Sequence, residues 1–298
     1  MPAGAAATGS PQTATPTAAE TVTEEVTLEA EAPVEAFSKQ RAMVHVRKLA
    51  GDIGVRVRAT RGESRGALYI AEKFRSFGYN VNIQKFEVDG GTSRNVVAWW
   101  PDSRQHGFVL GGHMDTVAAS PGANDNASGT AVLLEIARLV AGKAPSDWVR
   151  FVAFGSEEYG SNGIHHVGSQ TYVDRLGERG RNRLGGMTSV DMIADGRPLL
   201  VGNSGIADDV VARSLYRRIR DAGIAVRYHT LCDCTDHGPF EHAGIPASFA
   251  YSGPEKNNHE SSDTVANMEP RDLLRTGRAM RAFVLAIDRD MIERFRQH

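Results

Sequence analysis

The sequence predicts an α/β fold in which a mostly parallel or mixed central sheet is covered by helices on both faces. Strand patterns alternate along the chain with segments whose apolar residues recur every three or four positions, as in helices that pack on a sheet. Some of the expected strands are apolar over nearly their whole length, which indicates burial on both faces. Polar residues that can bind metal follow where these strands end, and ligands of open α/β sheets bind at the carboxyl ends of the strands.

The first half of the chain supplies three strand patterns and two helix patterns. Apolar residues in "ALYIAEKFRSFG" recur at helical spacing, and Gly78 marks the end of this helix before the strand pattern "YNVNIQKFEV". The stretches "SRNVVAWWP" and "HGFVLGGHMD" predict the next two strands. Residues 128–142 carry one apolar stripe and predict a helix, with Asn126 or Ser128 as its N-cap.

The second half continues the alternation without internal repeats. "WVRFVAF" and "GGMTSV" predict strands that are followed by acidic residues, and "ADDVVARSLYRRIRDAGI" predicts an amphipathic helix that ends at Gly223. The last stretch, "EPRDLLRTGRAMRAFVLAIDRDMIERF", predicts one long helix that docks on the rest of the fold with its arginines outward. Its apolar stripe contains Leu273, Met280, Val284, Ile287 and Met291.

Composition divides the chain into a tail and one globular domain. Residues 1–36 are rich in Ala, Thr and Pro, contain six glutamates and have no Lys or Arg, so we expect a disordered tail. No linker divides residues 37–298, which predict a single domain. A tail of this kind often remains after an export signal is removed, which predicts an extracellular or cell-envelope protein; a cytoplasmic protein with a native extension is the alternative.

Charge and hydropathy argue against two classes of partner. The 34 Lys and Arg residues nearly balance the 36 Asp and Glu residues, for a formal net charge of −2, so nothing favours nucleic acid or an anionic membrane surface. No apolar run approaches the ~18 to 20 residues that a membrane helix needs. We expect a protein without a membrane span and without a nucleic-acid partner, and a monomer.

The two cysteines leave three interpretations open. Cys232 and Cys234 lie one residue apart in "LCDCTDHGPF", so they could be reduced thiols, a local disulfide or metal ligands. Without a second cysteine pair they fall short of a structural zinc pattern.

Seven polar residues at the expected strand ends and turns form a candidate metal site. Each has an ordinary alternative, since a strand-end histidine is often only hydrogen-bonded and an aspartate in a Gly/Asn turn often caps a helix. An aspartate within the apolar run "TSVDMIA" is harder to explain, because a buried carboxylate needs a cation or several donors. Two imidazoles with several carboxylates suit Zn²⁺ better than Ca²⁺ or Mg²⁺. The residues are His113, Asp115, Asp125, Glu157, Glu158, Asp191 and His259.

The glutamate pair in "GSEEYG" is informative because neighbouring side chains at a strand end point in different directions. One carboxylate can bind a metal while the other faces a metal-bound water and takes its proton, as a hydrolase requires. Two solvated surface glutamates are the alternative, which the preceding apolar run "WVRFVAF" disfavours.

Taken together and in this order, "GGHMDTV", "GANDNASG", "GSEEYG", "VDMI" and "HESSDT" resemble the motifs of the M28 family of zinc-dependent peptidases. The resemblance extends from about residue 40 to the last helix. It implies a three-layer sandwich of the zinc-peptidase, phosphorylase/hydrolase-like type, with residues 37–298 as the catalytic domain. It also implies an aminopeptidase, which removes N-terminal residues from peptides with a free N-terminus.

The resemblance further implies two zinc ions per chain, ~3.5 to 4 Å apart, bridged by Asp125 and by the hydroxide that attacks the substrate. Glu157 would be the general base and then the acid. Asp115 would accept the N–H of His113 and so fix its orientation. The other zinc ligands would be His113 and Asp191 on one ion, and Glu158 and His259 on the other.

Three departures from the family pattern concern the substrate. Asn258 stands directly before His259, where Streptomyces-type members have tyrosine, and Cys234 stands where some members have arginine. The link "SNGIHHV" is several residues longer than usual and brings His165 and His166 close to the site. We expect the first substrate side chain to bind near "CTDHGPF", with the candidate contacts Asn258, Asp236, His237 and Phe240.

Two other functions stay open from the sequence. The chain could be another amide hydrolase of the same type, such as a dipeptidase, a carboxypeptidase-like enzyme or an N-acyl or deblocking hydrolase. It could also be a metal-free, peptidase-like binding module, whose sequence sign would be the loss of a ligand or of the base. Neither loss is seen here.

Overall fold

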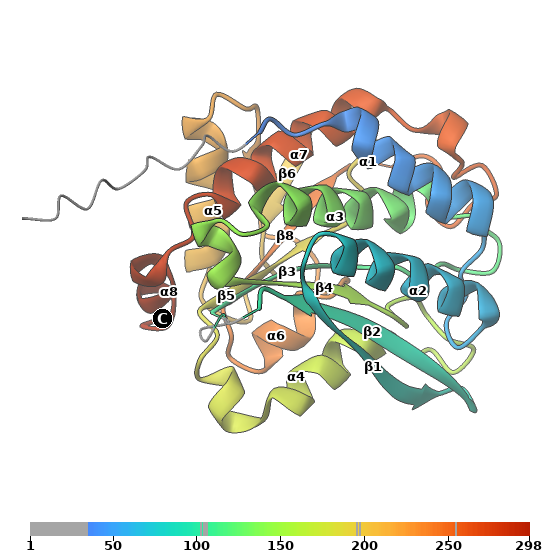
Figure 1. Ribbon diagram of the computed structural model, residues 1–298, viewed down its shortest axis with the longest axis horizontal. Coiled ribbons are helices and arrows are strands. Elements are labelled where there is room, and N and C mark those ends of the chain that lie inside the picture. Colours follow the sequence, from blue (N-terminus) through green and yellow to red (C-terminus); the bar gives the residue numbers. More distant parts are fainter. Residues whose placement is uncertain (1–34, 102, 104–106, 195, 197, 254) are drawn as a thin grey trace, which may run out of the picture. The chain divides into compact units, whose positions relative to one another are not determined.

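A mixed β-sheet forms the centre of the fold (Figure 1). The computed structural model describes residues 35–101, 103, 107–194, 196, 198–253 and 255–298. In these residues the sheet has eight strands in the order β1-β2-β4-β3-β5-β8-β6-β7. The strands are β1 (Asn80–Val88), β2 (Gly91–Trp99), β3 (Phe108–His113), β4 (Val149–Phe154), β5 (Gly186–Val190), β6 (Leu199–Gly202), β7 (Arg227–Tyr228) and β8 (Ala247–Ser252).

The centre of this sheet is parallel and its flanks are antiparallel. Strands β4, β3, β5 and β8 run parallel to one another, and β6 pairs parallel with β7. The pairs β1-β2, β2-β4 and β6-β8 are antiparallel. The predicted mixed sheet is confirmed, and the parallel centre brings the ends of β3, β4 and β5 to one edge.

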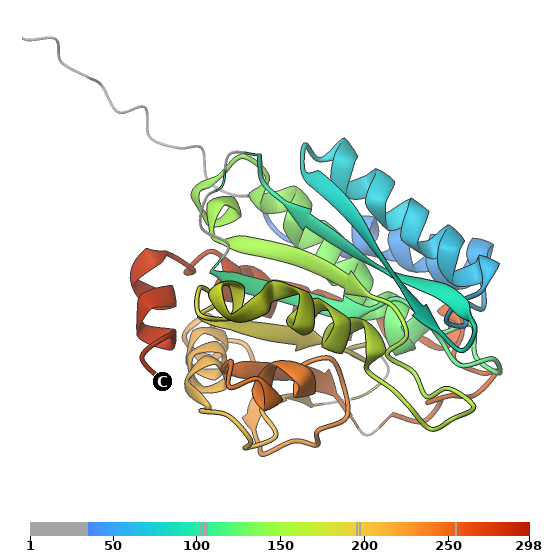
Figure 2. The same cartoon turned by 90° about the horizontal axis from the view of Figure 1, so that it is seen from below.

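Helices cover both faces of the sheet, as the apolar strands predicted (Figures 1 and 2). One face carries five helices and the larger buried core, while the other carries two helices over a smaller core. The first set is α1 (Lys39–Val46), α2 (Arg61–Ser76), α3 (Gly129–Val140), α5 (Val210–Asp221) and α7 (Pro270–Val284). The second set is α4 (Val167–Arg181) and α6 (Gly238–His242).

Short helical turns connect these elements: η1 (Arg47–Ile53), η2 (Ala123–Ser128), η3 (Ala144–Asp147) and η4 (Val265–Asn267). The regular part of α3 begins after η2. The Asn126 side chain caps it by accepting the backbone N–H of Gly129 at 2.8 Å, whereas Ser128 donates its hydroxyl to the carbonyl of Asn124. Of the two predicted caps, the structure selects Asn126.

The prediction of one long C-terminal helix is wrong, because the chain forms two helices there. Helix α7 ends at Val284, and α8 spans Arg289–Phe295. Asp288 adopts an extended conformation and its carboxylate accepts the backbone N–H of Met291 at 2.8 Å, so it starts a new helix. All five residues of the predicted stripe are nevertheless buried, which explains why the apolar spacing continued across the break.

The disordered tail predicted for residues 1–36 lies outside the described residues, apart from its last two positions. All helices and strands belong to one compact unit, Val34–His298. In the part of the chain that the structure describes, no helix combines the length and the apolar character needed to cross a membrane.

Candidate metal centre

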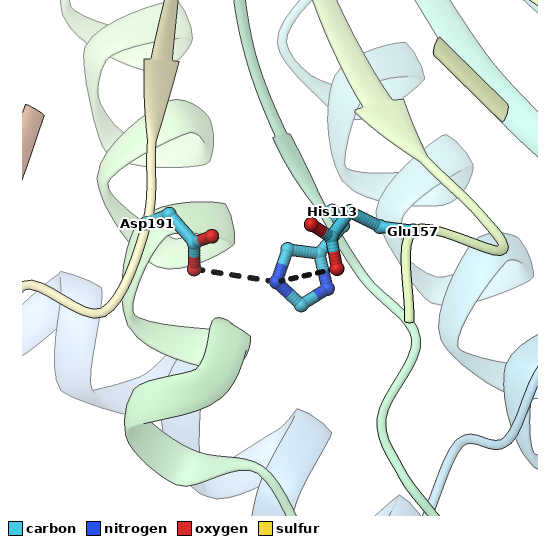
Figure 3. Close-up of side chains that lie close together, drawn as sticks. All are labelled: His113, Glu157 and Asp191. Atoms are coloured by element: carbon cyan, nitrogen blue, oxygen red, sulfur yellow. Dashed lines mark hydrogen bonds and ion pairs between the residues drawn. The ribbon is translucent and has the colours of Figure 1, made fainter. Parts of the chain in front are cut away.

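The predicted metal-binding residues meet at the carboxyl edge of the parallel strands. His113 is the last residue of β3, Glu157 and Glu158 follow β4, and Asp191 directly follows β5. Figure 3 shows Glu157 and Asp191 pointing toward the imidazole of His113 from two sides. Asp125 comes from η2 and His259 from the loop after β8.

A glycine directly before His113 lets β3 approach its neighbour closely at this edge. A Cβ on Gly112 would lie only 2.6 Å from the backbone oxygen of Val190 in β5. The same oxygen accepts a hydrogen bond from the Asn126 side chain at 2.9 Å. Gly112 of "GGHMDTV" therefore allows close packing of β3, β5 and η2 next to the histidine.

His113 contacts three carboxylates through one nitrogen. Its Nε2 lies 3.0 Å from Oδ1 of Asp125 and 3.2 Å from Oδ1 of Asp191. Oε2 of Glu157 is more distant, at 3.8 Å. Among the described residues, His113 thus belongs to two groups of converging ligand atoms, one with Glu157 and Asp191 and the other with Asp125 and Glu158.

His259 contacts the other oxygen of Asp125, and it also contacts Glu158. Nε2 of His259 lies 3.0 Å from Oε2 of Glu158 and 3.3 Å from Oδ2 of Asp125. The two oxygens of the Asp125 carboxylate therefore face two different imidazoles. This is the arrangement that a carboxylate bridging two cations requires.

The spacing and the burial of these groups fit metal binding. A tetrahedral zinc with N and O ligands at about 2.0–2.1 Å holds neighbouring ligand atoms about 3.3 Å apart, close to the 3.0–3.3 Å contacts of His113 and His259. The side chains of Glu157, Glu158, Asp125 and Asp191 are buried. Four carboxylates gathered in a buried space need a compensating positive charge, which two imidazoles do not supply in full.

The pKa values of the clustered residues are shifted by burial and by their charged neighbours. Burial and, after it, the charge of Asp125 raise the pKa of Glu158 to about 7, and burial raises the pKa of Glu157 well above its usual value. Hydrogen bonds to Asp125 and Glu158 raise the pKa of His259 to about 10. A divalent cation in the cluster would favour the ionised form of these carboxylates and so oppose the rise in the pKa of Glu157 and Glu158.

Asp115 supports the centre mainly through the backbone of the glutamate pair. Its two carboxylate oxygens accept the backbone N–H groups of Glu157 and Glu158 at 3.1 and 3.2 Å. Nδ1 of His113 lies 3.2 Å from the backbone oxygen of Asp115 and 3.7 Å from its carboxylate. Asp115 thus lies beside His113 as predicted, but its nearer oxygen is the backbone carbonyl, and its carboxylate orients the glutamates.

Three supporting residues had no role in the sequence analysis. Asp263, within the "HESSDT" motif, accepts the backbone N–H of Asp125 at 3.0 Å, and Thr235 donates its hydroxyl to Asp191 at 2.8 Å. The buried guanidinium of Arg56 donates to the backbone oxygens of Met114 and of the turn before Asp125. The motif could have indicated Asp263, and Thr235 lies in the stretch "CTDHGPF" that was expected near the site, but no pattern around Arg56 pointed to it.

The metal-binding residues line a cavity of about 230 Å³. Asn258, a predicted substrate contact, is part of its wall, and its side-chain nitrogen lies 3.1 Å from Oδ2 of Asp125. The expectation that the longer link brings both of its histidines to the site is confirmed. The remaining wall residues are Tyr159, His165, His166, Met192 and Cys234, of which Tyr159 and Met192 were not identified from the sequence.

Three predicted substrate contacts, Asp236, His237 and Phe240, are not among the residues that line this cavity, and their contact with a substrate stays a prediction. The chain turns into α6 here and points these side chains into the interior. The Phe240 ring packs against Phe154 and Tyr172 in the smaller core. His237 lies 3.0 Å from the hydroxyl of Ser204, and Asp236 is fully buried.

Of the three interpretations of the cysteines, the structure has the disulfide, which joins Cys232 to Cys234. Cys234 belongs to the wall of the cavity. The cysteines therefore contribute no thiolate to the metal-binding cluster.

The fold and the cluster define an α/β protein with a candidate centre for two metal ions. Comparison with known families makes this specific: residues 95–284 match the model of peptidase family M28. The chain belongs to this family.

Two curated proteins are similar to this chain in sequence. Leupeptin-inactivating enzyme 1 of Streptomyces exfoliatus is 32% identical over 190 residues, covering 62% of this chain and 42% of the relative. Aminopeptidase YwaD of Bacillus subtilis is 31% identical over 206 residues, covering 65% of this chain and 44% of the relative. The chain thus spans less than half the length of each of these relatives.

A solved structure supports the fold. BSAP, a zinc aminopeptidase from Bacillus subtilis, superimposes with a TM-score of 0.79 at 20% identity, covering 87% of this chain and 97% of that chain. The predicted three-layer architecture is therefore confirmed.

Proposed function

We propose that the chain is a dizinc aminopeptidase, which removes N-terminal residues from peptides with a free N-terminus. Membership of peptidase family M28 and the name of one relative, aminopeptidase YwaD, support this class. The observation that carries the dinuclear proposal is the Asp125 carboxylate, whose two oxygens lie 3.0 and 3.3 Å from two different imidazoles.

The contacts suggest how the ligands divide. His113 and Asp191 would hold one zinc ion, and Glu158 and His259 the other, with Asp125 shared between them. When bound, the two ions would lower the pKa of a shared water molecule and stabilise the negative charge that develops on the scissile carbonyl.

Glu157 could also be counted as a ligand, because its carboxylate lies in the same cluster as His113 and Asp191. Its oxygen is 3.8 Å from Nε2 of His113, however, while the two other carboxylates are at 3.0 and 3.2 Å. This offset favours the general base. Glu157 would take a proton from the attacking water and deliver it to the leaving amine.

The acidic surroundings also suit the substrate end that an aminopeptidase recognises. A protonated α-amine would be attracted by the carboxylates of the cavity, and Asn258 lies at the same wall, close to Asp125. We further propose that residues 37–298 form one catalytic domain and that residues 1–36 form a tail. The protein would be a monomer without a nucleic-acid partner. Action outside the cytoplasm is supported by the Cys232–Cys234 disulfide, since disulfides persist in oxidising compartments.

A substrate panel tests the activity. Zinc-loaded protein is assayed on leucyl-, phenylalanyl- and lysyl-p-nitroanilide, on the N-acetylated forms of the same compounds, and on N-acetylated peptides with a free C-terminus. The proposal predicts release from the free-amine compounds alone. Release only from acetylated compounds would assign a deblocking hydrolase, release from the C-terminus a carboxypeptidase, and the absence of all release would favour the binding module.

A further inference from the structure

We infer that His166 is a positioning residue for Glu157: its imidazole holds one oxygen of the Glu157 carboxylate, so that the other oxygen faces the metal-binding cluster. This inference rests on the proposed role of Glu157 as the general base. His166 comes from the link "SNGIHHV" between "GSEEYG" and "GSQTYV".

The two oxygens of Glu157 have different partners. Oε1 lies 3.2 Å from Nε2 of His166, and Oε2 faces Nε2 of His113 at 3.8 Å. The last torsion of a glutamate side chain is broad and does not fix the carboxylate plane by itself. An external contact is therefore needed to keep one oxygen aimed at the cluster, and His166 supplies it.

The backbone places His166 firmly beside Glu157. The N–H of His166 donates to the carbonyl of Glu157 at 2.8 Å, and the N–H of Val167 donates to the carbonyl of Ser156 at 2.9 Å. Ser156 and His166 both have positive φ, 55° in each case. Such conformations are uncommon outside glycine and cluster at functional sites.

The guanidinium of Arg58, which lies outside the metal-binding cluster, holds the link before His166 in place. Arg58 donates one guanidinium nitrogen to the backbone oxygens of Glu158, at 3.1 Å, and of Ile164, at 2.7 Å. This contact ties the chain just after the glutamate pair to the chain just before His166. The position of the imidazole is thus fixed from both ends of the link.

Aromatic rings cover the His166–Glu157 contact. Both residues are 7% exposed, and the His165 ring packs edge-on against His166 with centroids 3.9 Å apart. Tyr159 packs in turn on His165 at 4.3 Å. A polar contact screened from water in this way is stronger than an exposed one, which makes it suited to hold a carboxylate in one orientation.

His166 is better explained as a positioning residue than as a metal ligand. Among the described residues, His166 contacts one carboxylate of the cluster, Glu157, whereas His259 contacts both Asp125 and Glu158.

The test compares His166→Ala and His166→Gln with His229→Ala, which removes an exposed imidazole remote from the cavity. Zinc per chain, kcat and KM are measured on leucyl-p-nitroanilide. His166→Ala should lower kcat about 10- to 100-fold, the usual scale for a lost orienting partner, with KM within about threefold and zinc unchanged. His166→Gln, whose amide can still donate to Oε1, should recover part of kcat, and His229→Ala should match the wild type.

An unchanged kcat in His166→Ala would overturn the inference, and so would a loss of zinc or a change confined to KM. Crystal structures of the zinc-loaded wild type and His166→Ala separate this result from failure of the proposed function. The inference predicts the Glu157–His166 contact in the wild type and a turned Glu157 carboxylate in the variant. An identical carboxylate orientation in both would refute it even if the wild type cleaves no peptide.

Discussion

Replacing Glu157 with glutamine separates the base from the metal ligands. Glutamine has nearly the same shape as glutamate and can still contact His166, but it cannot accept a proton from water. The five proposed zinc ligands, which are joined by contacts of 3.0–3.3 Å, are untouched. A general base contributes about 10²- to 10⁴-fold to the rate, or about 3–5 kcal/mol of barrier, so Glu157→Gln should lose kcat by this factor.

The assay is steady-state hydrolysis of leucyl-p-nitroanilide by zinc-loaded protein, with zinc per chain measured on the same sample. Glu178→Gln, the same change at an exposed position of α4, is the matched control and should keep full activity. A Glu157→Gln variant with near-normal kcat would refute the assignment of the base. A variant that has lost zinc would instead identify Glu157 as a ligand.

Two further predictions concern the fold. Burial, with smaller contributions from Lys73 and Arg138, lowers the pKa of His45 to about 4, so the unfolded chain binds more protons than the folded chain between about pH 6.5 and 4. Stability should therefore fall as the pH drops through this window, with His45 contributing about 2 kcal/mol between pH 7 and pH 5. His45→Gln should remove that part of the slope in denaturant unfolding, and an unchanged slope would contradict it. Phe240→Ala should cost about 3–5 kcal/mol of stability, because the ring packs in the core. For the same reason, the KM of the folded variant should be unchanged. A selective rise in KM would identify Phe240 as a substrate contact.

The parts of the site that were predictable from the sequence lie at the ends of apolar strands. His113, Glu157 and Asp191 each follow a strand that reads clearly in the sequence, and parallel neighbours must present their ends at one edge. The motifs supplied Asp125 and His259, which come from a turn and a loop. For His113, Glu157 and Asp191 a local pattern was sufficient, because each of these residues lies at or just after the end of its strand.

The missed parts depend on contacts distant in the sequence or on side-chain direction. Arg56 and Asp263 act on the turn around Asp125 from far along the chain, and no local pattern shows such a contact. Phe240 is the last residue of "CTDHGPF", a stretch that reaches the cavity at Cys234, but in α6 its ring packs in the core. The break before α8 was missed because buried residues continue at helical spacing on both sides of Asp288.

Metal stoichiometry tests the central claim, a pair of zinc ions bridged by Asp125, most directly. Wild-type protein and Asp125→Ala, both prepared with zinc and without chelator, are analysed for metal per chain after removal of unbound ions. The account predicts about two zinc ions in the wild type and fewer than one in Asp125→Ala, because the substitution removes the one carboxylate that both sites share. A wild type with a single zinc ion, or an Asp125→Ala protein that still binds two, would contradict it.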